Sequence, residues 1–281
     1  MHPAKRDRFS AGPRPAQWKA VLPARTRIFQ AVIPVAAGVP PGAATGAAIA
    51  PSVHGLAGIL AGVGAAALVA IAIAAIFWAM SITMLLRSIG ARAAYPGVPG
   101  IQHLEVVVEV NCARTGLKPP RIWVVNADIP NALALGVSPG NGRLVVTTGL
   151  LSQLDPMELE AVTAHELLHI GSGEAVTATL LAAFLLPVAR LWSGSGRLVY
   201  RLLGRGRELA ADRRAMSLTC YPPAMISALE KMARRADATT GLLHGAATVT
   251  CWIWTVPAGP LPPPQDEPDH PFVRLAALAE L

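Results

Sequence analysis

A long uncharged segment constrains this chain more than any other feature. Residues 28–86 contain no Asp, Glu, Lys or Arg. One membrane-crossing helix needs about 20 apolar residues, so this segment can hold two crossings and the turn between them. The second crossing, within residues 55–86, has the apolar centre "GAAALVAIAIAAIFWAM". The first is apolar but carries Pro34, Pro40 and Pro41, which predict a kink. We therefore expect a transmembrane helix pair.

The charges beside this segment indicate its orientation. Residues 1–27 are rich in Lys and Arg and broken by Pro and Gly, which predicts a basic disordered tail. Positive residues favour the cytoplasmic side, and two crossings return the chain there, where Arg87 and Arg92 follow. Two alternatives stay open: residues 28–50 as a signal-peptide-like segment, or a single crossing. Either alternative would place the rest of the chain outside. We favour a multi-pass protein of the cell membrane with its main domain facing the cytoplasm.

The composition favours a lipid partner over a nucleic acid. Apolar residues make up 53% of the chain and charged residues 15%, below the roughly 25% usual for globular domains. The net charge of +7 comes from cations that flank apolar segments, and no aromatic–basic binding motif is present, so we expect no nucleic-acid binding. Cys112, Cys220 and Cys251 are far apart and odd in number, which argues against a disulfide framework.

Residues 100–281 have the pattern of a domain that mixes helices and strands. "HLEVVVEVNCARTG" predicts an amphipathic helix that ends at Gly116. "RIWVVN" and "RLVVTT" predict strands, and "NALALGV" between them is a third candidate. The turn cluster "SPGNG" would join the last two strands in a hairpin. The expected fold class is α+β and mostly helical, with a small β-sheet.

The next predicted helix begins with a strong start signal. Asp155 is a favourable N-cap, Pro156 suits the first helical turn and Glu158 completes a capping box. The helix then contains "HELLH", which has the order H-E-x-x-H. This motif has chemical meaning on a helix, and the start signal supplies that context.

The H-E-x-x-H spacing is typical of a zinc peptidase. Residues four apart share a helix face, so His165 and His169 can present two imidazoles to one metal ion. Glu166, the next residue, can accept the proton of a zinc-activated water. Two helix histidines that bind no metal are the less favoured alternative.

The third metal ligand must come from another part of the chain. Glu174 lies about 140° around a continuous helix from His169, so it is a poor ligand unless the helix breaks at "GSG". Glu208 is the better candidate. Glu208 and Asp212 are four residues apart in "RELAADRRA", so Asp212 would contact the outer nitrogen of a liganding histidine.

Glu208 can reach the histidines only if the apolar segment between them does not cross the membrane once. A crossing hairpin would need about 40 apolar residues, and this segment contains Arg190, Arg197 and Arg201. We expect residues 175–192 to form a helix that returns, packed on the domain or lying at the membrane surface.

Together these motifs resemble the HtpX-like membrane zinc endopeptidases, which are related to the CAAX prenyl proteases. The matching segments are "PNALALG", "RLVVTTGLLSQLDPMELEAVTAHELLHI", "RELAADRRA" and "DHPFVRLAAL", and they cover roughly residues 100–281. The resemblance implies a zincin-like, gluzincin-type metallopeptidase domain over 100–281 that holds one Zn²⁺ per chain. It also implies His165, His169 and Glu208 as ligands and Glu166 as the general base.

The resemblance implies further site residues. Asn131, Ala132 and Leu133 would belong to an edge strand that binds extended polypeptide by strand addition. His270 would stabilise the oxyanion of the tetrahedral intermediate, with a purely structural helix-start role as the alternative. The chain departs from the family in three places: "GSGE" follows the second histidine, the segment before the glutamate ligand is short, and Arg274 follows His270 by four residues where relatives usually have six.

The function expected from the sequence is that of a membrane-anchored zinc endopeptidase. It would hydrolyse peptide bonds of membrane or unfolded proteins through a zinc-activated water. The alternatives are a dedicated processing protease for one peptide or prenylated substrate, and a non-catalytic membrane adaptor that retains the zinc fold. Residues 242–264 would form a flap or a membrane-contacting loop.

Overall fold

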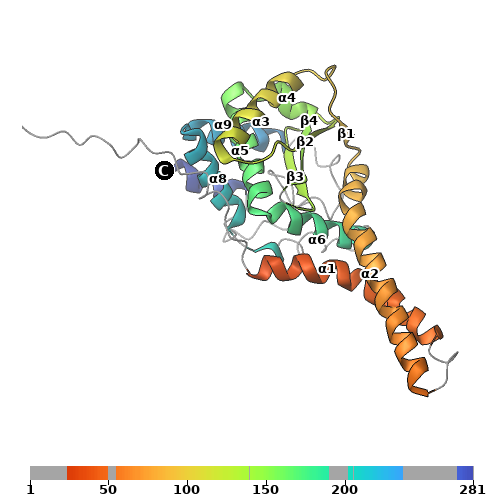
Figure 1. The fold of residues 1–281 in the computed structure, drawn as a ribbon. Helices are drawn as coiled ribbons and strands as arrows, with labels where there is room; N and C mark the ends of the chain where they lie inside the picture. Colours follow the sequence, from red (N-terminus) through yellow and green to blue (C-terminus); the bar gives the residue numbers. More distant parts are fainter. Residues whose placement is uncertain are drawn as a thin grey trace, which may run out of the picture.

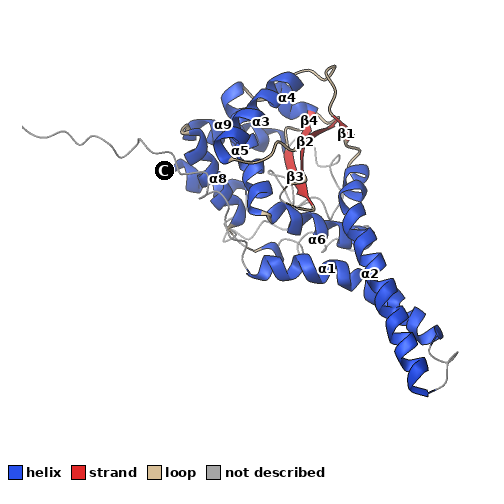
Figure 2. Ribbon diagram, viewed as in Figure 1, coloured by secondary structure: helices blue, strands red, loops and turns tan. Residues whose placement is uncertain are grey.

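A four-stranded mixed sheet organises the domain. The computed structural model describes residues 24–49, 55–138, 140–189, 202–204, 206–236 and 271–280. The strand order is β1-β2-β4-β3, with β2 and β4 parallel and the outer pairings antiparallel. Figure 2 shows that the sheet is small beside the surrounding helices. The strands are β1 (Arg92–Ala93), β2 (Arg121–Val125), β3 (Ala132–Gly136) and β4 (Gly142–Thr147).

The three strands predicted from the sequence are confirmed. β3 and β4 form the predicted antiparallel hairpin, whose register ends with Gly136 opposite Gly142. The short strand β1 was not predicted, because two residues between a membrane helix and a proline-containing loop carry no periodicity.

Alternating residues of the strands face two separate apolar cores. Ala132 and Ala134 of β3 belong to one core, which is built mainly with α3, α5, α8 and α9. Leu133 and Leu135 belong to the other, built with α2 and α6. A sheet covered on both faces needs apolar residues at every position, which explains the continuous apolar run "ALAL".

Helices cover both faces of the sheet. The predicted helix that ends at Gly116 is α3, and Gly116 adopts the left-handed conformation with φ 68°. The helices of the domain are α3 (Ile101–Thr115), α4 (Thr148–Gln153), α5 (Pro156–Ser172), α6 (Glu174–Ala189), α8 (Arg207–Thr219), α9 (Pro222–Ala236) and α10 (Pro271–Ala279).

Two N-terminal helices are α1 (Ala24–Ile49) and α2 (Gly55–Ser88). In Figure 1 the first part of α1 and the last part of α2 lie against the domain, and the remainder of the two helices projects away from it as a pair. Among the described residues, one continuous helix, Leu56–Ser88, is long and apolar enough to cross a membrane. Its most apolar 18 residues have a mean hydropathy of 2.6, and only 6% of them are buried. In α1, Val32–Ala48 is a shorter apolar helix. One membrane helix is thus supported directly, and the predicted second crossing stays a proposal.

The two N-terminal helices touch along a row of small residues. Gly38, Gly42 and Gly46 of α1 lie so close to α2 that an added Cβ would come within 2.2–2.7 Å of its backbone carbonyl oxygens. Helix pairs in membranes use such small residues to bring their backbones together. α1 also begins at Ala24, inside the segment assigned to a basic tail, while residues 1–23 lie outside the described part of the chain.

Candidate metal centre

The helix that carries the histidines starts as its sequence predicts. The Asp155 side chain accepts from the backbone N–H groups of Met157 and Glu158, and the Glu158 carboxylate accepts from the N–H of Asp155. This is the predicted capping box, with Pro156 in the first turn. The rest of α5 is almost entirely buried, so the helix that this signal starts lies at the centre of the domain.

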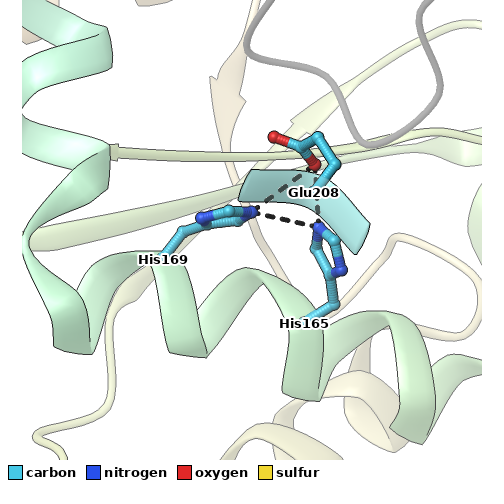
Figure 3. Close-up of side chains that lie close together, drawn as sticks. All are labelled: His165, His169 and Glu208. Atoms are coloured by element: carbon cyan, nitrogen blue, oxygen red, sulfur yellow. Dashed lines mark hydrogen bonds and ion pairs between the residues drawn. The ribbon is translucent and has the colours of Figure 1, made fainter. Parts of the chain in front are cut away.

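Three candidate ligand atoms converge at one point between α5 and α8. Nε2 of His165 lies 3.1 Å from Nε2 of His169 and 3.1 Å from Oε2 of Glu208. The third side of the triangle, from Nε2 of His169 to Oε2 of Glu208, measures 3.5 Å. Figure 3 shows both rings and the carboxylate pointing at the same space. The structure therefore brings together the three residues predicted as zinc ligands.

The triangle has the size that a tetrahedral zinc site requires. Zn–N and Zn–O bonds of about 2.0–2.1 Å at tetrahedral angles place neighbouring ligand atoms about 3.3–3.4 Å apart. The observed separations of 3.1, 3.1 and 3.5 Å bracket this value. Two imidazoles and one carboxylate are also a donor set that zinc accepts with one position left for water or substrate. The residues present fit a catalytic zinc ion.

A carboxylate from α8 orients the first histidine. Nδ1 of His165 lies 2.8 Å from Oδ1 of Asp212, as the sequence predicted. Arg274 of α10 in turn binds Asp212: its Nε and Nη2 each donate a hydrogen bond of 2.7 Å to one carboxylate oxygen. All three side chains are at most 1% exposed. The C-terminal helix thus supplies a buried cation whose role the sequence did not reveal.

A second carboxylate orients the other histidine. Oε2 of Glu174 lies 2.9 Å from Nδ1 of His169. The chain does break at "GSG": α5 ends at Ser172, Gly173 adopts φ 77°, and the two helices meet at 83°. Glu174 therefore does not join the triangle of ligand atoms, but it contacts the outer nitrogen of His169 in the way that Asp212 contacts His165.

The electrostatics of the cluster favour a positive charge at its centre. Burial alone would lower the pKa of His169, but the Glu208 charge and the hydrogen bonds to Glu174 and Glu208 raise it to about 10. Burial is likewise outweighed at His165, where the close carboxylates of Asp212 and Glu208 raise the pKa. Burial opposes ionisation of Glu208, yet Arg207 and His169 hold the pKa of its carboxyl well below the ordinary value. A divalent cation would supply the charge that these groups favour.

Glu166 is a buried carboxyl on the same helix as the two histidines. Its side chain is 1% exposed, and its Oε2 makes no hydrogen bond to any part of the chain that the structure describes. Burial raises its pKa, although the nearby His165 and His169 partly counter this effect. A buried carboxylate oxygen without a protein partner is uncommon, and here it lies on the helix that carries both candidate histidine ligands.

Comparison with known proteins agrees with this geometry. The family model described as Peptidase family M48 matches residues 102–278. The chain belongs to peptidase family M48. It is an HtpX-like member: Protease HtpX homolog of Moorella thermoacetica is 35% identical over 181 residues, covering 53% of this chain and 60% of that protein. Protease HtpX homolog of Acidiphilium cryptum is 36% identical over 214 residues, covering 62% of this chain and 72% of that protein.

These alignments do not cover the whole of each relative. The chain spans about 60% of the length of the Moorella protein. Protease HtpX homolog 1 of Streptomyces coelicolor is 35% identical over 173 residues, which cover 50% of this chain and 55% of that protein. No solved structure matches the chain.

The predicted substrate strand of this M48 domain is the edge strand β3. The Thr147 N–H donates to the carbonyl of Asn131, which identifies Asn131, Leu133 and Leu135 as the residues whose backbones pair with β4. The backbone groups of Ala132 and Ala134 consequently point to the other side, the sheet edge. The N–H of Ala132 already donates to its neighbour Asn131 Oδ1 at 3.0 Å.

The remaining predicted site residue, His270, lies outside the described residues, as does the candidate flap 242–264. The helix predicted within residues 175–192 is α6, which packs on α1, α2 and β3. Its predicted return falls in residues 190–201, which the structure does not describe. The sequence analysis missed Arg274 as the partner of Asp212; its place after "DHPF" was the one signal available.

Proposed function

We propose that this protein is a membrane-anchored zinc endopeptidase. The observation that carries the proposal is the triangle of His165, His169 and Glu208 ligand atoms next to Glu166, whose buried Oε2 has no hydrogen-bond partner among the described residues. Membership in peptidase family M48 supports peptide-bond hydrolysis as the reaction. The substrates we propose are polypeptides of membrane or unfolded proteins.

Each residue of the centre has a defined task in this reaction. A bound zinc ion would lower the pKa of a water molecule and polarise the scissile carbonyl. Glu166 accepts the proton of the attacking water and then delivers it to the leaving amine. Its raised pKa suits a group that must hold and release a proton. Asp212 and Glu174 keep the two imidazoles aimed inward, so that the Nε2 atoms stay available as ligands.

The substrate is proposed to bind along β3 as an added strand. The carbonyl of Ala132 and both backbone groups of Ala134 point away from β4, toward the sheet edge. Both residues are buried in this structure, so an extended peptide would pair with them only after the segments that cover β3 move aside. Main-chain pairing is indifferent to side-chain identity, which suits an enzyme that acts on unfolded segments. Asn131 and Leu133 would support this edge from within the sheet. His270 remains the proposed oxyanion partner.

The N-terminal helices are proposed to insert into the cell membrane as a pair. The 17 residues Val32–Ala48 of α1 rise about 26 Å as a helix, close to the roughly 30 Å hydrocarbon core, and their glycines pack tightly on α2. The start of α1 and the end of α2 would then lie on the same side of the membrane. The domain follows Arg87 on that side, which the positive-inside rule makes the cytoplasmic side.

Zinc content and proteolysis together test the proposed function. The detergent-purified protein should hold one zinc per chain and cleave an unfolded protein substrate. Glu166→Gln should keep the zinc and lose cleavage by about 10²–10⁴-fold. Glu208→Ala should lose the zinc. The matched control is Glu160→Gln, since Glu160 lies on the same helix and pairs with Arg114 on the surface. Full cleavage by Glu166→Gln would refute the general-base assignment, and inactivity of the wild type would favour the adaptor.

A further inference from the structure

One polar side chain of α1, that of Gln30, reaches the junction between α5 and α6. Nε2 of Gln30 donates to the carbonyl of Gly173 at 3.1 Å and to Oγ1 of Thr177 at 3.0 Å. In Figure 1 the first part of α1 runs beside α6, and the two helices are in contact along this stretch. The N-terminal helix therefore touches the metallopeptidase domain through a specific polar contact as well as by apolar packing.

The contact falls on the joint between two helices. Gly173 ends α5 in the left-handed conformation, and α6 departs from it at 83°. The carbonyl of Gly173 also accepts from the N–H of Val176, so it belongs to the first turn of α6, and Thr177 lies in the same turn. By binding both, Gln30 holds the first turn of α6 where it leaves the bend. Both N–H donors of the amide are used, so an apolar side chain of similar size could fill the space but could not make this link.

The bend matters because it places Glu174. Glu174 is the first residue of α6, and its carboxylate lies 2.9 Å from Nδ1 of His169. Around a straight helix the same residue would point about 140° away from His169. The angle of the joint thus decides whether His169 has its orienting partner, and Gln30 bonds to the turn of α6 that begins at Glu174.

We infer that Gln30 is a positioning residue for the metal centre, acting through the Gly173 joint and Glu174 on His169. This inference rests on the proposed zinc site. It gives α1 a second role besides membrane anchoring: the anchor helix completes the geometry of the catalytic domain. The coupling runs through three hydrogen bonds, from Gln30 to Gly173, from Gln30 to Thr177 and between Glu174 and His169.

The test compares zinc affinity across a set of full-length variants in detergent. Gln30→Leu removes both hydrogen bonds, and Thr177→Val removes one of them. Thr45→Val is the matched control, because the Thr45 hydroxyl bonds to the carbonyl of Pro41 within α1, away from the joint. Zinc dissociation constants are measured by competition with a chromophoric chelator. Melting temperatures verify that each variant is folded, and Thr177→Val carries the test if Gln30→Leu does not fold.

We expect Gln30→Leu to weaken zinc binding about three- to ten-fold and Thr177→Val about two- to three-fold, while Thr45→Val matches the wild type. Glu174→Gln should weaken it about 10–100-fold. If Gln30 acts through Glu174, adding Gln30→Leu to Glu174→Gln should change the affinity by less than about two-fold. At saturating zinc, KM should stay constant in Gln30→Leu because the proposed substrate strand β3 is untouched. The kcat should fall because Glu174 no longer holds His169 in its orientation.

Two results would overturn the inference. Gln30→Leu could bind zinc as tightly as the wild type, or it could have its full effect in the Glu174→Gln background. In both cases the wild type still binds zinc and cleaves substrate, so the proposed function stands. A wild type that binds no zinc would instead overturn the proposed function itself.

Discussion

The buried ion pair between Arg274 and Asp212 should be tested by removing first one partner and then both. Arg274→Met keeps the length of the side chain but removes the guanidinium whose Nε and Nη2 lie 2.7 Å from the two carboxylate oxygens. Asp212 is 0% exposed, so its charge would be left buried with His165 as its remaining close partner. Breaking such a pair costs about 3–5 kcal/mol.

The contact with His165 should keep this cost near the lower limit, at about 3 kcal/mol. For a domain of this size, 1 kcal/mol corresponds to about 2–4 °C in Tm, so Arg274→Met should melt about 6–12 °C below the wild type. Melting is followed in detergent with a chelator present, so that zinc binding does not contribute. Arg234→Met is the control: Arg234 is exposed and pairs with Glu230 at 3.6 Å, so its loss should change stability by at most about 0.5 kcal/mol.

The double variant Arg274→Met with Asp212→Leu separates stability from metal binding. Replacing both partners by apolar residues removes the unpaired charge, so the melting temperature should recover most of the loss. His165 would then lack its orienting carboxylate, and zinc affinity should fall about 10–100-fold. The single variant should show the opposite pattern: low stability with at most a few-fold change in zinc affinity, since Asp212 still contacts Nδ1 of His165.

Two results would refute this reasoning. A melting temperature of Arg274→Met within about 2 °C of the wild type would show that Asp212 does not depend on Arg274. Wild-type zinc affinity in the double variant would show that Asp212 does not orient His165.

Three further predictions concern the helix start, the anchor and the metal. Asp155→Ala should lower the stability of the domain by about 1–2 kcal/mol through loss of the capping box, while Asp155→Ser should cost less than half as much in the same melting experiment. Gly42→Leu should separate α1 from α2 and lower the melting temperature in detergent, since its Cβ would lie 2.5 Å from the carbonyl oxygen of Ala66; Gly64→Leu, whose Cβ meets no described atom within 4 Å, should not. Free zinc at a hundred times its Kd should stabilise the chelator-treated protein by about 2.7 kcal/mol, seen as a rise in Tm that Glu208→Ala does not show.

Short-range chemistry made much of the fold predictable. The α5 start follows from Asp155, Pro156 and Glu158, whose interactions span three residues and need no knowledge of the rest of the chain. Gly116 ends α3 for an equally local reason, since a left-handed residue is needed there. The ligand pair His165 and His169 also depends only on helix periodicity, which is why the motif alone predicted two of the three atoms that meet.

Contacts between distant segments explain what the sequence left open. The position of Glu174 relative to His169 depended on whether the helix broke at "GSG". Glycine and serine are compatible both with a continuous helix and with a break, so local propensity could not decide this. In the folded protein α6 packs on the sheet, and its first turn accepts two hydrogen bonds from Gln30, far away in α1. Arg274 is 62 residues from Asp212, and nothing in its local pattern distinguishes a buried arginine from an exposed one.

The two histidines therefore depend on opposite ends of the chain. His165 is oriented by Asp212, which α10 holds through Arg274, and His169 is oriented by Glu174, whose helix joins α5 at the bend that α1 contacts through Gln30. The H-E-x-x-H motif supplies the imidazoles but cannot set their ring orientations, because each Nδ1 takes its partner from outside the helix. Zn–N bonds are only about 2 Å long, so small rotations of the imidazole rings would change how well the two Nε2 atoms bind a metal ion. The motif is local, whereas the geometry of the proposed metal site involves contacts from the first and last described helices.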